Sequence, residues 1–144
     1  MKLSGILSTL AVVVTLMAST SCSDKKFDVS GNITDAKDSL LYFENMSLNG
    51  AVVVDSVRLD EDGSFDFSVN APEAPEFYRL RIANQIINIA ADSIGEVAVK
   101  ASYPTMATDY EVTGSDDCSK IKELAIRQMA LQANINGIIA NRTL

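Results

Sequence analysis

The fold is decided by residues 51–69, which read Ala-Val-Val-Val-Asp-Ser-Val-Arg-Leu-Asp-Glu-Asp-Gly-Ser-Phe-Asp-Phe-Ser-Val. Valine dominates the first half, and in the second half Phe65, Phe67 and Val69 alternate with polar residues. Between the halves, Asp60-Glu61-Asp62-Gly63 has the composition of a turn. This order predicts two strands joined as a hairpin with one apolar face.

Short segments of the same kind lie on both sides of this stretch. Alternating or compact apolar residues predict further strands at 27–33, 40–43, 77–82, 86–90, 97–99 and 110–112. Asn84-Gln85 is expected to turn the chain between two of them. Pro72 and Pro75 cannot donate backbone hydrogen bonds, so residues 71–75 are expected to be a connection. We therefore predict a mainly β protein, an antiparallel β-sandwich of about seven or eight strands followed by a C-terminal helix.

The helix is expected to begin at Ser115, a favourable N-cap residue, because Asp116 and Asp117 then suit the helix dipole. Apolar residues at heptad spacing form a stripe, interrupted by Gln128: Ile121, Leu124, Leu131, Ile135 and Ile138. We expect the stripe to pack on the parent domain; the alternative is a partner helix or a following domain. Gly137 is expected to loosen the end of the helix.

The N-terminus has the organisation of a secretion signal. Met1-Lys2 is the charged start, Ile6–Met17 is an apolar run too short for an ordinary membrane span, and small residues lead to Cys22. We expect residues 1–21 to be a lipoprotein signal peptide and Cys22 the lipidation site. The alternative is ordinary secretion, with cleavage between Thr20 and Ser21.

The expected organisation is then a tether at 22–26, a β-sandwich domain at 27–114 and a C-terminal helix or linker at 115–140. The chain carries 12 basic and 19 acidic residues, a formal net charge of −7, and its basic residues are scattered. A nucleic-acid partner is therefore not expected. Lys25-Lys26 is expected to lie beside lipid headgroups, and because no acidic run follows Cys22, we expect the periplasmic face of the outer membrane.

Histidine is absent from the sequence, so the usual nucleophile-base pairs and the commonest metal ligand are missing. The sequence also contains no Gly-rich phosphate loop and no Cys-x-x-Cys. We therefore expect no catalytic residues, no cofactor and no metal, and a protein that is not an enzyme. Asp60–Ser64 resembles part of a calcium loop, but an acidic β-turn is favoured. Cys118 is interpreted as a partly buried or incidental thiol in preference to a redox centre.

Three triplets fit an O-glycosylation signal of Bacteroidetes envelope proteins, in which Asp precedes Ser or Thr and an apolar residue follows. They place candidate glycans on Ser39, Ser56 and Ser93. Aspartate and serine are also common at the ends of strands, so the structural interpretation remains open beside the modification.

The strand and turn motifs together resemble a known family, domain of unknown function 4369, which is found at the N-terminus of Bacteroidetes lipoproteins. The resemblance covers about residues 24 to 135 and is carried by these segments: Phe27–Ile33, Leu41–Asn45, Val54–Val57, Asp62–Phe65, Pro75–Leu80 and Gly114-Ser115. In that family the β domain often precedes a thioredoxin-like domain with Cys-x-x-Cys, which this sequence lacks.

The resemblance implies an accessory module. Our leading expectation is a non-catalytic, membrane-tethered lipoprotein domain that associates with other proteins through its sandwich and C-terminal helix. One alternative is the N-terminal part of a thioredoxin-like thiol-disulfide oxidoreductase, whose missing domain would lie against the helix. The other is an envelope protein that binds a glycan or small ligand.

Overall fold

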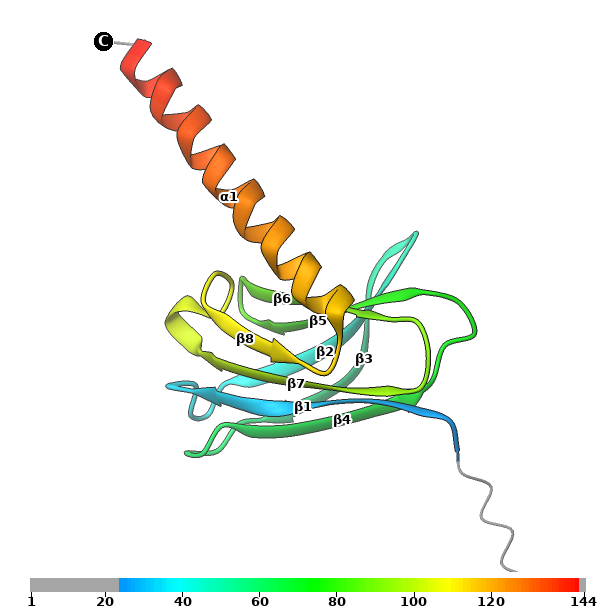
Figure 1. Ribbon diagram of the computed structural model, residues 1–144. Helices are drawn as coiled ribbons and strands as arrows, with labels where there is room; N and C mark the ends of the chain where they lie inside the picture. The colour runs from blue at the N-terminus through cyan, green and yellow to red at the C-terminus, as the bar shows by residue number, and fades with distance from the viewer. Residues whose placement is uncertain (1–23, 143–144) are drawn as a thin grey trace, which may run out of the picture.

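The computed structural model describes residues 24–142. In this part of the chain, eight strands form two four-stranded sheets, and one long helix follows them (Figure 1). The elements are β1 (Lys26–Thr34), β2 (Leu40–Ser47), β3 (Gly50–Arg58), β4 (Ser64–Asn70), β5 (Glu76–Ile82), β6 (Gln85–Ala91), β7 (Gly95–Ser102), the 3-10 helix η1 (Tyr103–Thr105), β8 (Tyr110–Thr113) and α1 (Asp116–Arg142). The prediction of a mainly β sandwich with a C-terminal helix is confirmed.

The first sheet has the strand order β4-β1-β7-β8 and the second has the order β3-β2-β5-β6. All pairings are antiparallel except that of β1 with β7, which is parallel. Side chains that alternate along the strands of both sheets meet in one core. At its centre the Phe43 ring stacks between Phe67 and Tyr78, with ring centroids 5.2 and 5.0 Å apart.

The predicted hairpin of residues 51–69 is wrong, because its two strands belong to different sheets. β3 pairs with β2, whereas β4 pairs with β1 and sets Phe67 opposite Val29. The turn between them crosses from one sheet to the other, and the Ile33 N–H donates to the Gly63 carbonyl at 2.9 Å. Gly63 has φ +68°, and a Cβ there would lie 1.9 Å from the Ile33 carbonyl oxygen. Alternation and turn composition are the same for a hairpin and for such a crossing, so the local pattern could not separate them.

The other strand predictions agree with the structure in kind, with shifted bounds. β5 and β6 form an antiparallel hairpin whose two-residue turn is Ala83-Asn84, one residue earlier than expected. The proline segment 71–75 is a connection without a strand, and its Ala71 N–H donates to the Lys25 carbonyl at 2.9 Å. β7, with eight residues, is longer than the sequence indicated.

The helix α1 begins as predicted, because the Cys118 N–H donates to the Ser115 hydroxyl oxygen at 3.2 Å. It continues through Gly137, where the sequence predicted a looser end. Its first turns pack against β6 and β8, and the rest projects away from the sandwich (Figure 1). The expectation that the apolar stripe packs on the parent domain is therefore wrong.

The reason lies in which side of α1 meets the sandwich. Cys118 contacts β6 and Lys122 contacts β8, so these residues define the packed face. At 3.6 residues per turn, the stripe from Leu124 to Ile138 is centred about 150° around the helix from that face. The heptad spacing was visible in the sequence, but these two anchoring contacts were not.

Candidate functional site

The apolar stripe of α1 is the most unusual surface of the described chain. Leu124, Leu131 and Ile138 are 65%, 60% and 57% exposed, although such side chains normally lie in cores. Ile135 adds further exposed apolar area on the same side of the helix. A contiguous apolar surface of this kind is typical of a site that another macromolecule covers. We call residues 121–138 on this side of α1 the α1 stripe.

The base of the α1 stripe is held firmly against the sandwich. The buried Cys118 thiol donates to the Ala90 carbonyl oxygen, and its sulfur accepts from the Ala90 N–H, each at 3.4 Å. β6 is an edge strand, so these contacts occupy backbone groups that no neighbouring strand can pair. The Lys122 ammonium donates to the Tyr110 carbonyl oxygen of β8. Cys118 is fully buried, where sequence analysis expected a partly buried or incidental thiol.

A hollow of about 280 Å³ lies beside this base. Phe77 and Ala90 line it from the second sheet, and Lys120 and Ile121 line it from the helix. Phe77 is exposed, and Ile121 is half-buried. The apolar surface of the stripe therefore continues onto the sandwich at this point.

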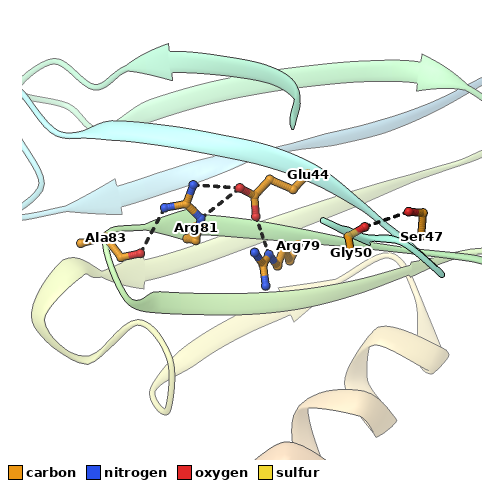
Figure 2. A network of polar contacts seen from close by, with 6 residues as sticks. All are labelled: Glu44, Ser47, Gly50, Arg79, Arg81 and Ala83. Atoms are coloured by element: carbon orange, nitrogen blue, oxygen red, sulfur yellow. Dashed lines mark hydrogen bonds and ion pairs between the residues drawn. The ribbon is translucent and has the colours of Figure 1, made fainter. Parts of the chain in front are cut away.

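A polar cluster lies on the outer face of the second sheet (Figure 2). Glu44 is buried and accepts from Arg81 Nη2 at 2.8 Å and Nε at 3.0 Å, while Arg79 donates to its other carboxylate oxygen. The Arg81 guanidinium also donates to the Ala83 carbonyl at 3.2 Å and lies over the Tyr42 ring, 4.5 Å from its centroid. The cluster thereby joins β2, β5 and the turn after β5.

The electrostatics of this cluster are those of a structural ion pair. The hydrogen bond from Arg81 is the largest influence on the pKa of Glu44; burial opposes it, the contacts with Arg79 reinforce it, and the pKa lies below its usual value. The carboxylate is thus ionised, and both of its oxygens are occupied. Sequence analysis missed Glu44, because only the pairing of β2 with β5 brings it to the two arginines.

The β2–β3 hairpin presents a second exposed apolar surface. β3 is an edge strand, and Val52, Val53 and Val54 are all exposed. Near the tip of the hairpin, the Ser47 hydroxyl donates to the Gly50 carbonyl at 2.9 Å (Figure 2). These exposed valines on an edge strand do not by themselves indicate which kind of ligand or partner the surface would bind.

The predicted lipidation site, Cys22, lies outside the described residues, and so does the signal peptide at 1–21. The three candidate glycosylation serines are not brought together. Ser39 is half-buried before β2 and Ser56 is exposed on β3, near the end of the sandwich that holds the β5–β6 turn. Ser93 is exposed at the opposite end, where its hydroxyl donates to Asp92 at 3.0 Å.

The acidic segment at 60–64 has the structure of a turn. The Asp60 carboxylate accepts from the Asp62 N–H at 3.0 Å and from the Gly63 N–H at 3.1 Å. Across residues 24–142, no group of three or more Asp, Glu, His or Cys side chains is placed to hold a metal ion. The acidic β-turn, which sequence analysis favoured over a calcium loop, is the observed arrangement.

The tyrosines do not form an aromatic platform for a sugar. Tyr78 and Tyr110 are buried, and Tyr42 and Tyr103 are half-buried. In the described part of the chain, no helix combines the length and the apolar character that crossing a membrane requires.

The fold and its surface define a β-sandwich module with a projecting helical arm. A family model described as a domain of unknown function (DUF4369) matches residues 27–120, and the chain belongs to this family. The matched residues comprise the sandwich and the first turn of α1, so the whole of the α1 stripe lies beyond them.

Comparison with curated proteins finds no match. Among solved structures, the chain is similar to the crystal structure of (S)-allantoin synthase, with 11% identity and a TM-score of 0.43. The similarity covers 65% of this chain and 45% of that one, so the chain spans less than half the length of that protein. A likeness this distant carries no inference about activity.

Proposed function

We propose that the chain is a non-catalytic lipoprotein module whose helix α1 binds another protein. The observation that carries the proposal is the exposed α1 stripe on a helix whose base is fixed by Cys118 and Lys122. A rigidly mounted apolar helix face is a common means of recognition, because a partner buries its i, i+3, i+4 and i+7 side chains in a groove or against another helix.

The proposed tether is a lipid on Cys22 at the periplasmic face of the outer membrane. β1 begins at Lys26, so four residue steps, at most about 14 Å of extended chain, would separate the anchor from the sandwich. The start of β1 and the tip of α1 lie at opposite ends of the molecule (Figure 1). The proposal therefore places the sandwich near the membrane and directs the helix away from it.

The non-catalytic part of the proposal is supported by the chemistry of the available side chains. The sequence contains no histidine, the Cys118 thiol is buried, and the Glu44 carboxylate is held between two guanidinium groups. None of these groups is placed to attack or deprotonate a substrate in solvent.

Site-specific photocrosslinking in a native-type host tests the interaction. A benzophenone amino acid at Leu131 should give a discrete higher-mass adduct, whereas the same group at exposed Asp66 on β4 should not. Equal adduct patterns at both positions would refute α1 as the binding element. The tether is tested separately with globomycin, which should cause the uncleaved precursor to accumulate; unchanged processing would contradict lipidation of Cys22.

Exposure to protease tests the proposed location. Proteinase K added to intact cells should leave the sandwich intact and degrade it after the outer membrane is opened. Rapid loss from intact cells would place the module on the cell surface instead.

A second candidate is the N-terminal part of a thioredoxin-like thiol-disulfide oxidoreductase. The uncovered α1 stripe favours it, because a following domain could pack there and bury the same residues. The DNA after the Leu144 codon discriminates between the two: a thioredoxin-like domain with Cys-x-x-Cys in any frame supports the oxidoreductase, and an unrelated gene removes it.

Glycan attachment remains a proposal for Ser39, Ser56 and Ser93. The exposure of Ser56 and Ser93 makes them the accessible pair, while Ser39 is half-buried. Intact mass of the protein from a native-type host tests the idea, since the absence of any added hexose mass would eliminate it.

A further inference from the structure

We infer that α1 pairs, parallel and in register, with α1 of a second copy of this chain. The inference rests on the proposed function and names the partner of the same site. It is drawn from the spacing of the α1 stripe, the distribution of charge along α1, one polar residue within the stripe, and the placement of the two ends of the molecule.

The spacing of the α1 stripe is that of a two-stranded coiled coil. Ile121, Gln128 and Ile135 fall at a positions, and three residues fall at d positions: Leu124, Leu131 and Ile138. The d residues are exposed and lie away from the face that contacts the sandwich, whereas Ile121 and Gln128 at a border open hollows beside β6. A second helix can therefore approach along the stripe without displacing the contacts that hold α1.

Charge along α1 favours an identical partner. Residues 128–141 contain no Asp, Glu, Lys or Arg, although the chain as a whole has a formal net charge of −7. Two acidic copies repel each other over most of their surfaces, and this neutral segment is where they can meet at little electrostatic cost. A partner chosen for opposite charge would find nothing to pair with there.

Gln128 indicates the parallel orientation. In a parallel pair, an a residue packs against the same a residue of the other helix, so the two Gln128 amides can donate to and accept from each other. In an antiparallel pair, Gln128 would face an apolar d residue and lose its hydrogen bonds to water without replacement. The flanking positions agree, since Arg127 at g would face Gln132 at e of the other copy, without like-charge contact.

The placement of the ends agrees with two copies in one membrane. Because β1 starts at the opposite end of the molecule from the tip of α1, parallel helices keep both starts on the same side (Figure 1). Two Cys22 anchors could then share a single bilayer. The α1 stripe spans only about three heptads, so pairing in dilute solution is weak, and confinement to a membrane raises the effective concentration.

Cysteine crosslinking of the full-length lipoprotein in its own envelope tests the inference. Leu131→Cys and Ile138→Cys each place a thiol at a d position, where parallel helices bring identical residues together. Ala133→Cys places one at f on the far side of the same helix and is the matched control. Both native cysteines are silent, because Cys118 is buried and Cys22 would be acylated.

We expect both d variants to form a reducible homodimer, at least about tenfold more abundant than that of Ala133→Cys, which corresponds to about 1.4 kcal/mol. Adding Leu131→Asp to the Ile138→Cys variant should abolish it while the circular dichroism of the sandwich is unchanged. Crosslinking at only one d position, or equally at Ala133→Cys, would overturn the parallel register.

The remaining outcomes separate this inference from the proposed function. An adduct of the d variants with a different protein would overturn self-pairing and leave the interaction function standing. No adduct at any position, together with no photocrosslink from Leu131, would overturn both.

Discussion

Glu44 depends on the fold for its whole environment, because its partners come from a different strand. It is the only charged side chain that is buried among residues 24–142, and Arg79 and Arg81 are its counter-ions. Glu44→Gln preserves the shape of the side chain but leaves both guanidinium groups without a carboxylate. We expect it to lower the free energy of unfolding by about 2 kcal/mol at pH 7, measured by urea denaturation.

The matched control is Glu61→Gln. Glu61 pairs with Lys37 at 3.8 Å, and both side chains are largely exposed, so the expected change is below about 0.5 kcal/mol. Equal losses in the two variants would show that the buried pair contributes no more than a surface pair.

The pH dependence of this contribution has a definite sign. Because the folded-state pKa of Glu44 is depressed, its stabilisation is fully present above the unfolded-state pKa of about 4.3 and is lost as pH falls through the folded-state value. The difference in unfolding free energy between wild type and Glu44→Gln should be constant from neutral pH to about pH 5 and then shrink. A difference at pH 3 as large as that at pH 7 would contradict the ion-pair assignment.

Tyr110 gives the complementary prediction at alkaline pH. Burial, with a smaller effect from Cys118, raises the pKa of Tyr110 to about 12. Its stabilisation is complete below the unfolded-state pKa of about 10 and is lost as pH rises to about 12, a change of order 2 kcal/mol. Tyr110→Phe should remove this part of the alkaline loss of stability in urea titrations at pH 9 to 12. If the free energy of unfolding of wild type and of Tyr110→Phe fell equally between pH 9 and 12, the assignment of this loss to Tyr110 would be refuted.

Residues whose role is local could be predicted, and residues whose role depends on distant partners could not. The Ser115 cap and the Asp60–Gly63 turn involve neighbours within three residues, so the sequence reveals them. Glu44 meets Arg79 and Arg81 only through the pairing of β2 with β5. A glutamate that follows an apolar strand segment gives no signal of such partners.

At the scale of elements, β3 is a strand held by one neighbour and exposed on both faces. Val52→Ala on β3 should therefore lower the free energy of unfolding by well under 1 kcal/mol, because the lost methyl groups already contact water. The same change at fully buried Val29 on β1 should cost about 2 kcal/mol. Urea denaturation of both variants measures the contrast, and similar losses would mean that β3 is covered in solution.

The elements themselves were largely predictable, and their assembly was less so. Alternation located the strands because each strand buries one of its faces, and this pattern is local. The pairing of β4 with β1 and of β3 with β2 depends on which strands complete each sheet. The turn between β3 and β4 is equally compatible with a hairpin and with a crossing between the sheets. In α1, likewise, the sequence displayed the stripe but not the contacts that direct it away from the sandwich.

At the scale of the whole molecule, the chain consists of a compact sandwich and the helix α1, whose first half packs on the sandwich and whose second half does not. The first half of α1 contacts the edge strands β6 and β8 through Cys118 and Lys122, and Cys118 is part of the core. Every residue from 128 to 142 is exposed, and the distal part of the helix projects away from the sandwich (Figure 1). Removal of the two halves should therefore have unequal effects on stability.

A stop codon after Arg127 should change the free energy of unfolding of the sandwich by less than about 1 kcal/mol, because exposed residues contribute little to it. A stop after Gly114 should cost about 3 kcal/mol, since it removes the buried Cys118 side chain with its two hydrogen bonds to Ala90 and exposes the core residues that Cys118 covers. Urea denaturation, followed by the β-sheet circular dichroism signal, measures both. If the stop after Arg127 lowered the free energy of unfolding as much as the stop after Gly114, the distal helix would contribute to the stability of the sandwich. Its apolar residues would then not be free to bind a partner.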